Sequence, residues 1–211
     1  MSVAPLSTET LEVRTRLAAL CRDYHGRGWM LGTSGNLSAR VDDRLVITAS
    51  GRHKGRVATS DFVELSADGA VTAAGPDARP SAETSIHVEI YRARPAVSCV
   101  LHVHTVSSTL AGLKGLETPE RSLDFRGLEM VKGWGLWEEH AEAKLSCFAN
   151  HTHVPDISKA IAAHLAQRSS HDEVPALLIA GHGITAWGAS VDEAHRHVEV
   201  TEFLSQVAMA R

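Results

Sequence analysis

Tyrosine and cysteine are scarce in this chain of 211 residues, with two and three copies respectively. The cysteines, Cys21, Cys99 and Cys147, are odd in number and widely spaced, so they predict no disulfide framework and fit a reducing compartment. Apolar runs of the ~18 residues that a membrane-spanning helix needs are absent as well. The N-terminus lacks the basic-then-apolar order of a signal peptide, so we expect a cytoplasmic protein without a membrane partner.

A strong charge of either sign is also missing, because 21 lysines and arginines stand against 25 aspartates and glutamates. The net charge of -4 gives no electrostatic reason to expect nucleic acid as a partner. Hydrophobic residues make up 44% and charged residues 22%, which excludes a disordered or coiled-coil chain. No repeat or composition shift divides the sequence, so we expect one domain over residues 1–211.

Periodic patterns predict helices and strands in mixed order. Apolar residues at spacings of three and four predict a helix from about Ser7 to Tyr24. Alternation of apolar and polar residues predicts hairpins around Asp42-Asp43 and Asp68-Gly69, whereas the region 115–150 has no clear pattern. This mixture predicts a layered α/β domain with a largely antiparallel sheet. The other expected elements are a helix capped by Ser81, strands over 96–104, 176–180 and 184–187, a helix capped by Asp156, and a last helix with a capping box at Ser190 and Glu193.

Histidine, in contrast, is abundant, with 13 copies. His102 and His104 lie two residues apart in an expected strand, where side chains alternate, so both imidazoles project from one face. Two nitrogens on one face can bind one cation at about 2.0–2.1 Å each. The ordinary alternative is a pair of half-buried strand histidines that only form hydrogen bonds, and for the pair alone this interpretation is favoured.

His182 lies between Gly181 and Gly183, directly after an expected apolar strand. Flanking glycines let the backbone turn sharply and approach another group closely. A lone Gly-His-Gly is a weak signal. Together with His102 and His104, however, it would form a three-histidine set with an open fourth position, which is typical of a catalytic zinc site.

The remaining histidines are weaker metal candidates. His151 and His153 repeat the two-residue spacing, but the Asn, Thr and Pro around them predict a loop. His164 falls on the apolar face of an expected helix, which is typical of a core or interface residue. His195 and His197 lie two apart on a helix and therefore do not share a face.

Two small turns that contain glycine flank the first expected hairpin. Residues 33–36 precede its first strand and residues 48–51 follow its second, so both turns meet at its open end. Their N–H groups and hydroxyls can hold a phosphate, and Lys54 can add a positive charge. Ser81 lies at an expected helix N-terminus, where the helix dipole favours anions. Considered alone, these segments are also ordinary turns and an ordinary cap, which is the favoured interpretation.

The chain contains, in this order, the motifs TSGN (33–36), TASG (48–51), PSAE (80–83), HVH (102–104) and AGHG (180–183). In this order and spacing they resemble the class II aldolase/adducin family, and the similarity covers nearly the whole chain. Each motif is weak alone, whereas five together are specific. The resemblance implies a three-layer α/β/α sandwich around a mixed, largely antiparallel sheet. It also implies one zinc ion per subunit and a homotetramer with active sites between neighbouring subunits.

The resemblance carries roles onto particular residues of this chain. It implies that His102, His104 and His182 bind zinc, and that the substrate is a sugar phosphate. Where the family often has two serines before its glutamate, this chain has Ser81 and Ala82, so one phosphate hydroxyl is missing. The implied phosphate contacts are Gly35, Asn36, Ser50, Gly51 and Ser81, with Lys54 added from the turn analysis above.

Three stretches resemble one branch of the family, which dehydrates 5-methylthioribulose 1-phosphate to 2,3-diketo-5-methylthiopentyl 1-phosphate in methionine salvage. They are SGRHKG (50–55), HVHTVSSTL (102–110) and GLEMVKG (127–133). The last stretch implies that Glu129 transfers the proton. The aldolase branch uses the glutamate of the PSAE motif, Glu83, which we expect in a supporting role here. Without the resemblance, Glu129 fits a solvated carboxylate that pairs with Lys132.

The scarcity of tyrosine bears on the choice of reaction. The aldolases of the family and the related 4-epimerases generally use tyrosines to handle the aldehyde oxygen, and this chain offers only Tyr24 and Tyr91, both before His102. We therefore favour elimination of water over cleavage of a carbon–carbon bond. A sugar-phosphate aldolase or 4-epimerase is the alternative enzyme. A non-catalytic binding protein, like the adducin heads, is the third hypothesis, and the intact histidine set argues against it.

Overall fold

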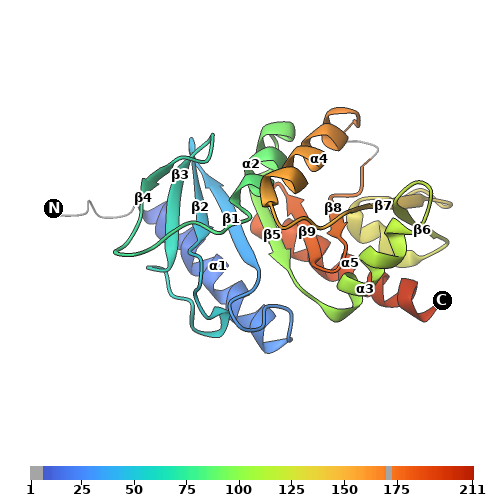
Figure 1. The fold of residues 1–211 in the computed structure, drawn as a ribbon, viewed down its shortest axis with the longest axis horizontal. Helices are drawn as coiled ribbons and strands as arrows, with labels where there is room; N and C mark the ends of the chain where they lie inside the picture. The colour runs from blue at the N-terminus through green and yellow to red at the C-terminus, as the bar shows by residue number, and fades with distance from the viewer. Residues whose placement is uncertain (1–6, 170–172) are drawn as a thin grey trace.

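The computed structural model describes residues 7–169 and 173–211 (Figure 1). None of the helices in these ranges is long and apolar enough to cross a membrane. The strands are β1 (Asn36–Val41), β2 (Arg44–Thr48), β3 (Phe62–Ser66), β4 (Val71–Ala73), β5 (Cys99–Val103), β6 (Ser122–Arg126), β7 (Glu142–Phe148), β8 (Ala176–Ile179) and β9 (Gly183–Gly188). The helices are α1 (Thr8–Gly26), α2 (Thr84–Ala93), α3 (Val106–Leu116), α4 (Val154–Ala166) and α5 (Val191–Ala210), with short 3-10 helices η1 (Lys54–Arg56) and η2 (Glu129–Trp134).

The strands form one sheet in the order β4-β3-β2-β1-β5-β9-β8-β7-β6. The pairing of β7 with β8 is parallel, and the other pairings are antiparallel. The prediction of a mixed, largely antiparallel sheet is therefore confirmed. The crossovers bring β1, β5 and β9 together in the middle of the sheet, although they lie far apart in the sequence.

Apolar side chains on the two faces of the sheet form two separate cores. Adjacent residues of β5 show the division, because Leu101 belongs to one core and Val100 to the other. The core of Leu101 includes side chains from α1, α3 and α5, and the core of Val100 includes side chains from α2 and α4. Helices thus cover both faces of the sheet, and the α/β/α sandwich is confirmed (Figure 1).

Local sequence signals predict several boundaries correctly. Ser7 caps α1 and accepts a hydrogen bond from the Thr10 N–H, and Ser190 caps α5 in the same way through the Glu193 N–H. Both predicted hairpins are present, as β1–β2 and β3–β4. The unassigned region 115–150 contains the end of α3, then β6, η2 and β7.

Two predicted helix caps are wrong. The helix expected from Ser81 begins at Thr84 with Glu83 as its N-cap, because Pro80 is held in a β-bridge with Ala49 and residues 82 and 83 form a turn before the helix. Asp156 lies inside the first turn of α4 and does not cap it. Its carboxylate there is close to the positive end of the helix dipole.

Gly183 marks the closest approach of the central strands. A Cβ atom at this position would lie 2.1 Å from the carbonyl oxygen of Val103, which is far inside van der Waals contact. We expect Gly183→Ala to lower the free energy of unfolding by roughly 1–3 kcal/mol or more, measured by urea denaturation. Gly26→Ala is the control, because a Cβ there meets nothing within 4 Å. Equal stability of the two variants would contradict the close packing of β5 and β9.

Candidate metal and phosphate site

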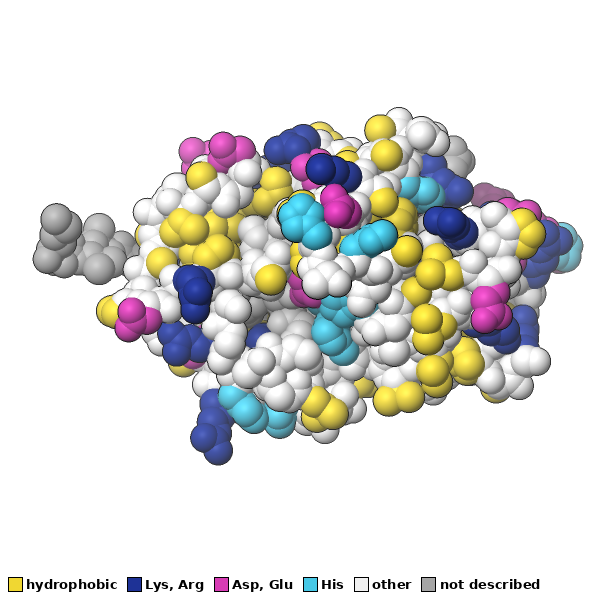
Figure 2. Space-filling view, in the orientation of Figure 1, with side chains coloured by type: hydrophobic (Ala, Val, Ile, Leu, Met, Phe, Trp, Pro, Cys, Tyr) yellow, Lys and Arg dark blue, Asp and Glu magenta, His cyan; other side chains and the backbone are white. Residues whose placement is uncertain are grey.

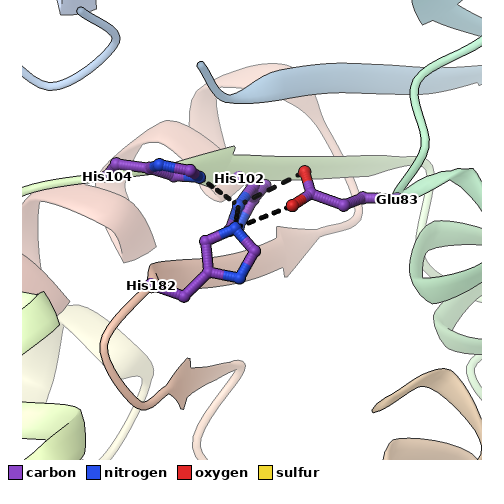
Figure 3. Close-up of side chains that lie close together, drawn as sticks. All are labelled: Glu83, His102, His104 and His182. Atoms are coloured by element: carbon purple, nitrogen blue, oxygen red, sulfur yellow. Dashed lines mark hydrogen bonds and ion pairs between the residues drawn. The ribbon is translucent and has the colours of Figure 1, made fainter. Parts of the chain in front are cut away.

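Four side chains converge where the C-terminal end of β5 meets the N-terminal end of β9, in the middle of the sheet (Figure 3). The Nε2 atom of His102 lies 2.8 Å from that of His104 and 3.3 Å from that of His182. Glu83 completes the group, with one carboxylate oxygen 2.7 Å from His182 Nε2 and the other 3.5 Å from His102 Nε2. One ligand atom from each of the four lies within 4.8 Å of the others. We call these four residues the cluster.

The backbone of the neighbouring strand orients His102. Its Nδ1 atom lies 2.7 Å from the carbonyl oxygen of Ile184 on β9. Because a carbonyl oxygen can only accept, Nδ1 carries the ring hydrogen and Nε2 directs its lone pair at the cluster. His104 lies one residue beyond β5 on the same face, and its N–H donates to the carbonyl of Trp29 at 2.9 Å. The predicted same-face arrangement of His102 and His104 is therefore confirmed.

Glycines place His182 as the sequence predicts. Gly181 adopts a φ of +64°, which favours glycine, and Gly183 allows the strand to touch Val103. Between them, the N–H of His182 donates to Ile179 at 3.0 Å and its carbonyl accepts from the Thr109 hydroxyl at 3.0 Å. The sharp turn thus presents the third imidazole to the other two.

Burial and neighbouring side chains shift the pKa values of His102, His104 and Glu83. Burial lowers the pKa of His102 to about 4 and, together with the neighbouring imidazoles, that of His104 to about 3. Burial also raises the pKa of Glu83, but the nearby histidines and the hydrogen bond with His182 lower it by more, so the carboxyl is ionised. Neutral imidazoles and a carboxylate at neutral pH are a donor set that fits a divalent metal ion.

A pocket of about 250 Å³ adjoins the cluster and reaches the two glycine-containing turns. Glu83 and His104 of the cluster are among its lining residues. The hollow near the middle of the face in Figure 2 lies where histidine side chains gather. All the predicted phosphate-binding residues line this pocket, namely Gly35, Asn36, Ser50, Gly51, Lys54 and Ser81. Their binding of phosphate stays a prediction.

Two interactions hold the turns in place. Lys54 is 1% exposed, and its ammonium group donates to the carbonyl oxygens of Thr33 at 2.9 Å and Arg52 at 3.1 Å. Its charge therefore lies under the turns, and burial lowers its pKa. Gly35 has a φ of +72°, and a Cβ there would lie 2.8 Å from the His102 carbonyl oxygen, so the first turn rests directly against the cluster.

Glu129 is the one predicted catalytic residue that lies outside this pocket. Its side chain is 81% exposed and pairs with Lys132 at 2.8 Å. It follows the edge strand β6, which is four places from β5 in the sheet. Since neighbouring strands are about 4.7–4.9 Å apart, roughly 19 Å separates these strands. Glu129 lines a different pocket, of about 420 Å³, together with Trp137.

The other histidines within the described ranges belong to no group of three or more possible metal ligands. His151 is exposed, and His153 is exposed and pairs with Asp156 at 3.2 Å. His164 contacts Ser146 at 3.1 Å, which agrees with the structural role expected for it. Within the described ranges, the cluster is the one group of three or more His, Cys, Asp or Glu residues that could hold a metal ion.

Sequence reasoning gave no role to His87 and only a supporting one to Glu83. Glu83 is a full member of the cluster, and its carboxylate also accepts a hydrogen bond from the amide of Asn36. His87 lies behind it on α2. The available signal was the closeness of His87 to the PSAE motif, four residues after Glu83.

Sequence comparisons match the chain to known proteins over nearly its full length. The family model described as "Class II Aldolase and Adducin N-terminal domain" matches residues 15–209. A methylthioribulose-1-phosphate dehydratase of Leptospira biflexa is 43% identical over 207 residues, which cover 96% of this chain and 97% of that protein. The protein of the same name from Bacillus subtilis is 37% identical over 191 residues, which cover 89% of this chain and 88% of that protein.

Solved structures share the fold at lower sequence identity. An L-fuculose 1-phosphate aldolase superposes with a TM-score of 0.76 and 20% identity, and the match covers 97% of this chain and 87% of that one. The L-fuculose-1-phosphate aldolase of Thermus thermophilus gives a TM-score of 0.68 and 23% identity, over 94% of this chain and 93% of that one. These two structures support the sandwich architecture.

The metal ligands can be tested by metal content alone. We expect His102→Ala to lose its bound metal, because removal of one of three imidazoles leaves too few nitrogen donors. The measurement is elemental analysis after gel filtration in metal-free buffer. His153→Ala is the control and should keep the wild-type metal content. A full equivalent of metal in His102→Ala would exclude the cluster as the metal site.

Proposed function

The chain belongs to the class II aldolase and adducin family, and from that premise we infer that it is a lyase that dehydrates methylthioribulose 1-phosphate in methionine salvage. The observation that carries this conclusion is the identity of 37–43% to dehydratases of that name over nearly the whole chain. The site agrees with it, because a cluster that could hold a metal ion and a turn-lined pocket lie side by side.

We propose that the pocket binds the two ends of the substrate separately. The turns at 33–36 and 48–51 hold the phosphate through N–H groups and hydroxyls, and buried Lys54 lies under them with its positive charge. The carbonyl end of the sugar then lies against His104 and Glu83 at the other end of the pocket. Binding at both ends orients the carbon atoms that react.

We propose Zn²⁺ as the metal, one ion per subunit, held by His102, His104 and His182. When bound there, it supplies a Lewis acid for the C2 carbonyl, which makes the proton on C3 acidic. Burial lowers the pKa of His102 to about 4 and that of His104 to about 3, so these two imidazoles provide nitrogen donors without competing protons. Ionised Glu83 lies next to His182 and adds a negative charge that helps to hold the cation and orient the sugar hydroxyls.

Water then leaves the substrate in balanced proton transfers. A carboxylate takes the proton from C3, and the hydroxyl group of C4 departs as water with a proton from an acid. The enol that remains between C3 and C4 gives up the proton of its C3 hydroxyl, takes up a proton at C4 and becomes the 2,3-diketone. We propose that Glu129 performs the transfer at C3 and that Glu83 supports it.

Glu129 can perform this role only from a second copy of the chain, because it lies outside the pocket of its own chain.

An exposed apolar stripe on α3 supports such an assembly. Val106, Leu110 and Leu113 are 78%, 44% and 47% exposed and lie along one face of the helix. Figure 2 shows hydrophobic side chains gathered over this part of the molecule. The stripe begins two residues after His104. We propose that a second copy covers it and that the assembly is a homotetramer.

The tyrosines support dehydration over aldol cleavage. Tyr24 is fully buried and contacts His195 at 2.7 Å, and Tyr91 is 3% exposed and contacts Ser38 at 2.8 Å. Neither lines the pocket beside the cluster. The chain therefore offers no tyrosine of its own at that pocket to handle a departing aldehyde.

One assay separates the two reactions. Purified protein with zinc and methylthioribulose 1-phosphate should form the 2,3-diketone, followed by its ultraviolet absorbance, and should release no aldehyde. Chelation of the metal should abolish turnover, and added zinc should restore it. Release of an aldehyde without diketone would replace the dehydratase by an aldolase.

Mixing of variants tests the position of Glu129. We expect Glu129→Gln to keep its metal and lose turnover, and His102→Ala to lose both. When the two are unfolded together and refolded, about a quarter of the sites combine an intact histidine set with an intact Glu129 from another subunit. Activity should therefore recover to about that fraction. Each variant refolded alone is the control, and no recovery in mixed oligomers would contradict action across the interface.

A further inference from the structure

Behind the cluster, α2 carries a buried histidine that the proposed reaction does not use. His87 is 1% exposed and lies in the first turns of α2, four residues after the N-cap Glu83. Its Nδ1 atom lies 2.7 Å from the hydroxyl of Ser38, which in turn lies 2.8 Å from the hydroxyl of Tyr91. Ser38 is 1% and Tyr91 3% exposed, so this chain of polar groups is enclosed in the core.

The other ring nitrogen of His87 is buried and has no hydrogen-bond partner in the protein. The same is true of the Oδ1 atom of Asn36, a residue that is 2% exposed. Asn36 and Ser38 lie two residues apart on β1, so both side chains project from the same face of the sheet, the face that α2 covers. An unpaired buried polar group costs about 1–3 kcal/mol. A water molecule with polar partners on two sides removes that cost.

Asn36 connects this enclosed pair to the cluster. Its amide nitrogen donates to one carboxylate oxygen of Glu83, while the other oxygen faces His182. A carboxylate can only accept, so the amide nitrogen must face Glu83 and the amide oxygen must point away from it. A group that bonds to this amide oxygen therefore holds the Asn36 amide in one orientation. The amide nitrogen in turn helps to hold the orientation of the Glu83 carboxylate.

The protonation of His87 suits this position. Burial lowers its pKa to about 4, against the opposing effect of the Glu83 charge. The imidazole is therefore neutral at neutral pH, with one nitrogen that donates and one that accepts. It can bind the Ser38 hydroxyl with one nitrogen and a water molecule with the other without placing a second charge behind the cluster.

We propose that His87 is a positioning residue for Glu83 and acts through a water molecule enclosed between His87 Nε2 and Asn36 Oδ1. The resulting chain runs from Tyr91 through Ser38, His87, the water and Asn36 to the carboxylate. It holds Glu83 in one orientation against His182. The inference rests on the proposed function, because the orientation of Glu83 affects turnover only if the cluster is the active site.

Two substitutions at His87 separate positioning from packing. His87→Asn keeps a polar atom near Ser38 and loses the Nε2 end, whereas His87→Gln reaches as far as Nε2. Loss of a partner behind a metal site typically costs 10–100-fold, so we expect His87→Asn to lower kcat by about 10–100-fold with KM and zinc content near wild type. His87→Gln should recover most of kcat. Equal kcat in His87→Asn and wild type would overturn the proposal.

A matched control and a second variant complete the series. His197 is 4% exposed and contacts the Trp187 carbonyl through Nδ1 at 2.6 Å, away from the cluster, so His197→Asn should leave kcat unchanged. Ser38→Ala removes the partner of His87 Nδ1 and should lower kcat in the same direction, which covers the case in which the His87 variants do not fold. An unchanged kcat in Ser38→Ala would also overturn the proposal.

A double-mutant cycle and a structure distinguish the possible failures. In the Glu83→Gln background, His87→Asn should cause no further loss, and additive losses would overturn the proposed link. If Glu83→Gln alone is as active as wild type, the role given to Glu83 in the proposed function fails. A high-resolution structure of the zinc enzyme then decides the remaining point. A water molecule bonded to both His87 Nε2 and Asn36 Oδ1 supports the proposed bridge. Apolar side chains that fill the space between these two atoms exclude it.

Discussion

The close contact between β5 and β9 is the constraint on which the site depends. Gly183 lets the β9 backbone press against Val103, and the antiparallel register sets Thr185 opposite His102. His182, just before β9, then lies over the two histidines at the end of β5. A side chain at Gly183 would separate the strands, so the geometry of the cluster follows from backbone packing as much as from the imidazoles themselves.

Burial of the cluster determines which of its atoms can act as metal ligands. The same desolvation that removes protons from His102 and His104 leaves nitrogen lone pairs aimed at one point, with ionised Glu83 beside them. The turns that line the pocket rest against the cluster through Gly35, so the proposed phosphate and metal sites have a fixed separation. Rigid separation of two binding groups is what allows one substrate to be held in a reactive orientation.

The single chain supplies most but not all of the proposed catalyst. Glu83 accepts a hydrogen bond from Asn36 and contacts His182, so partners within one subunit hold its carboxylate. Glu129 is solvated beside Lys132 and needs a second copy to reach the pocket. The exposed apolar stripe on α3 lies near the cluster, so the same contact that buries this stripe can bring another subunit to the site.

Local periodicity in the sequence determined the hairpin of β1 and β2, the caps at Ser7 and Ser190, and the projection of His102 and His104 from one face, because these features depend on a few neighbouring residues. The motif order identified the family. The tertiary structure decided what depends on distant residues: the bridge that keeps Pro80 extended, the union of Glu83 with the histidines, and the separation of Glu129 from them. Strand order in the sheet brings these groups together or apart, and the pattern along the chain does not encode that order locally.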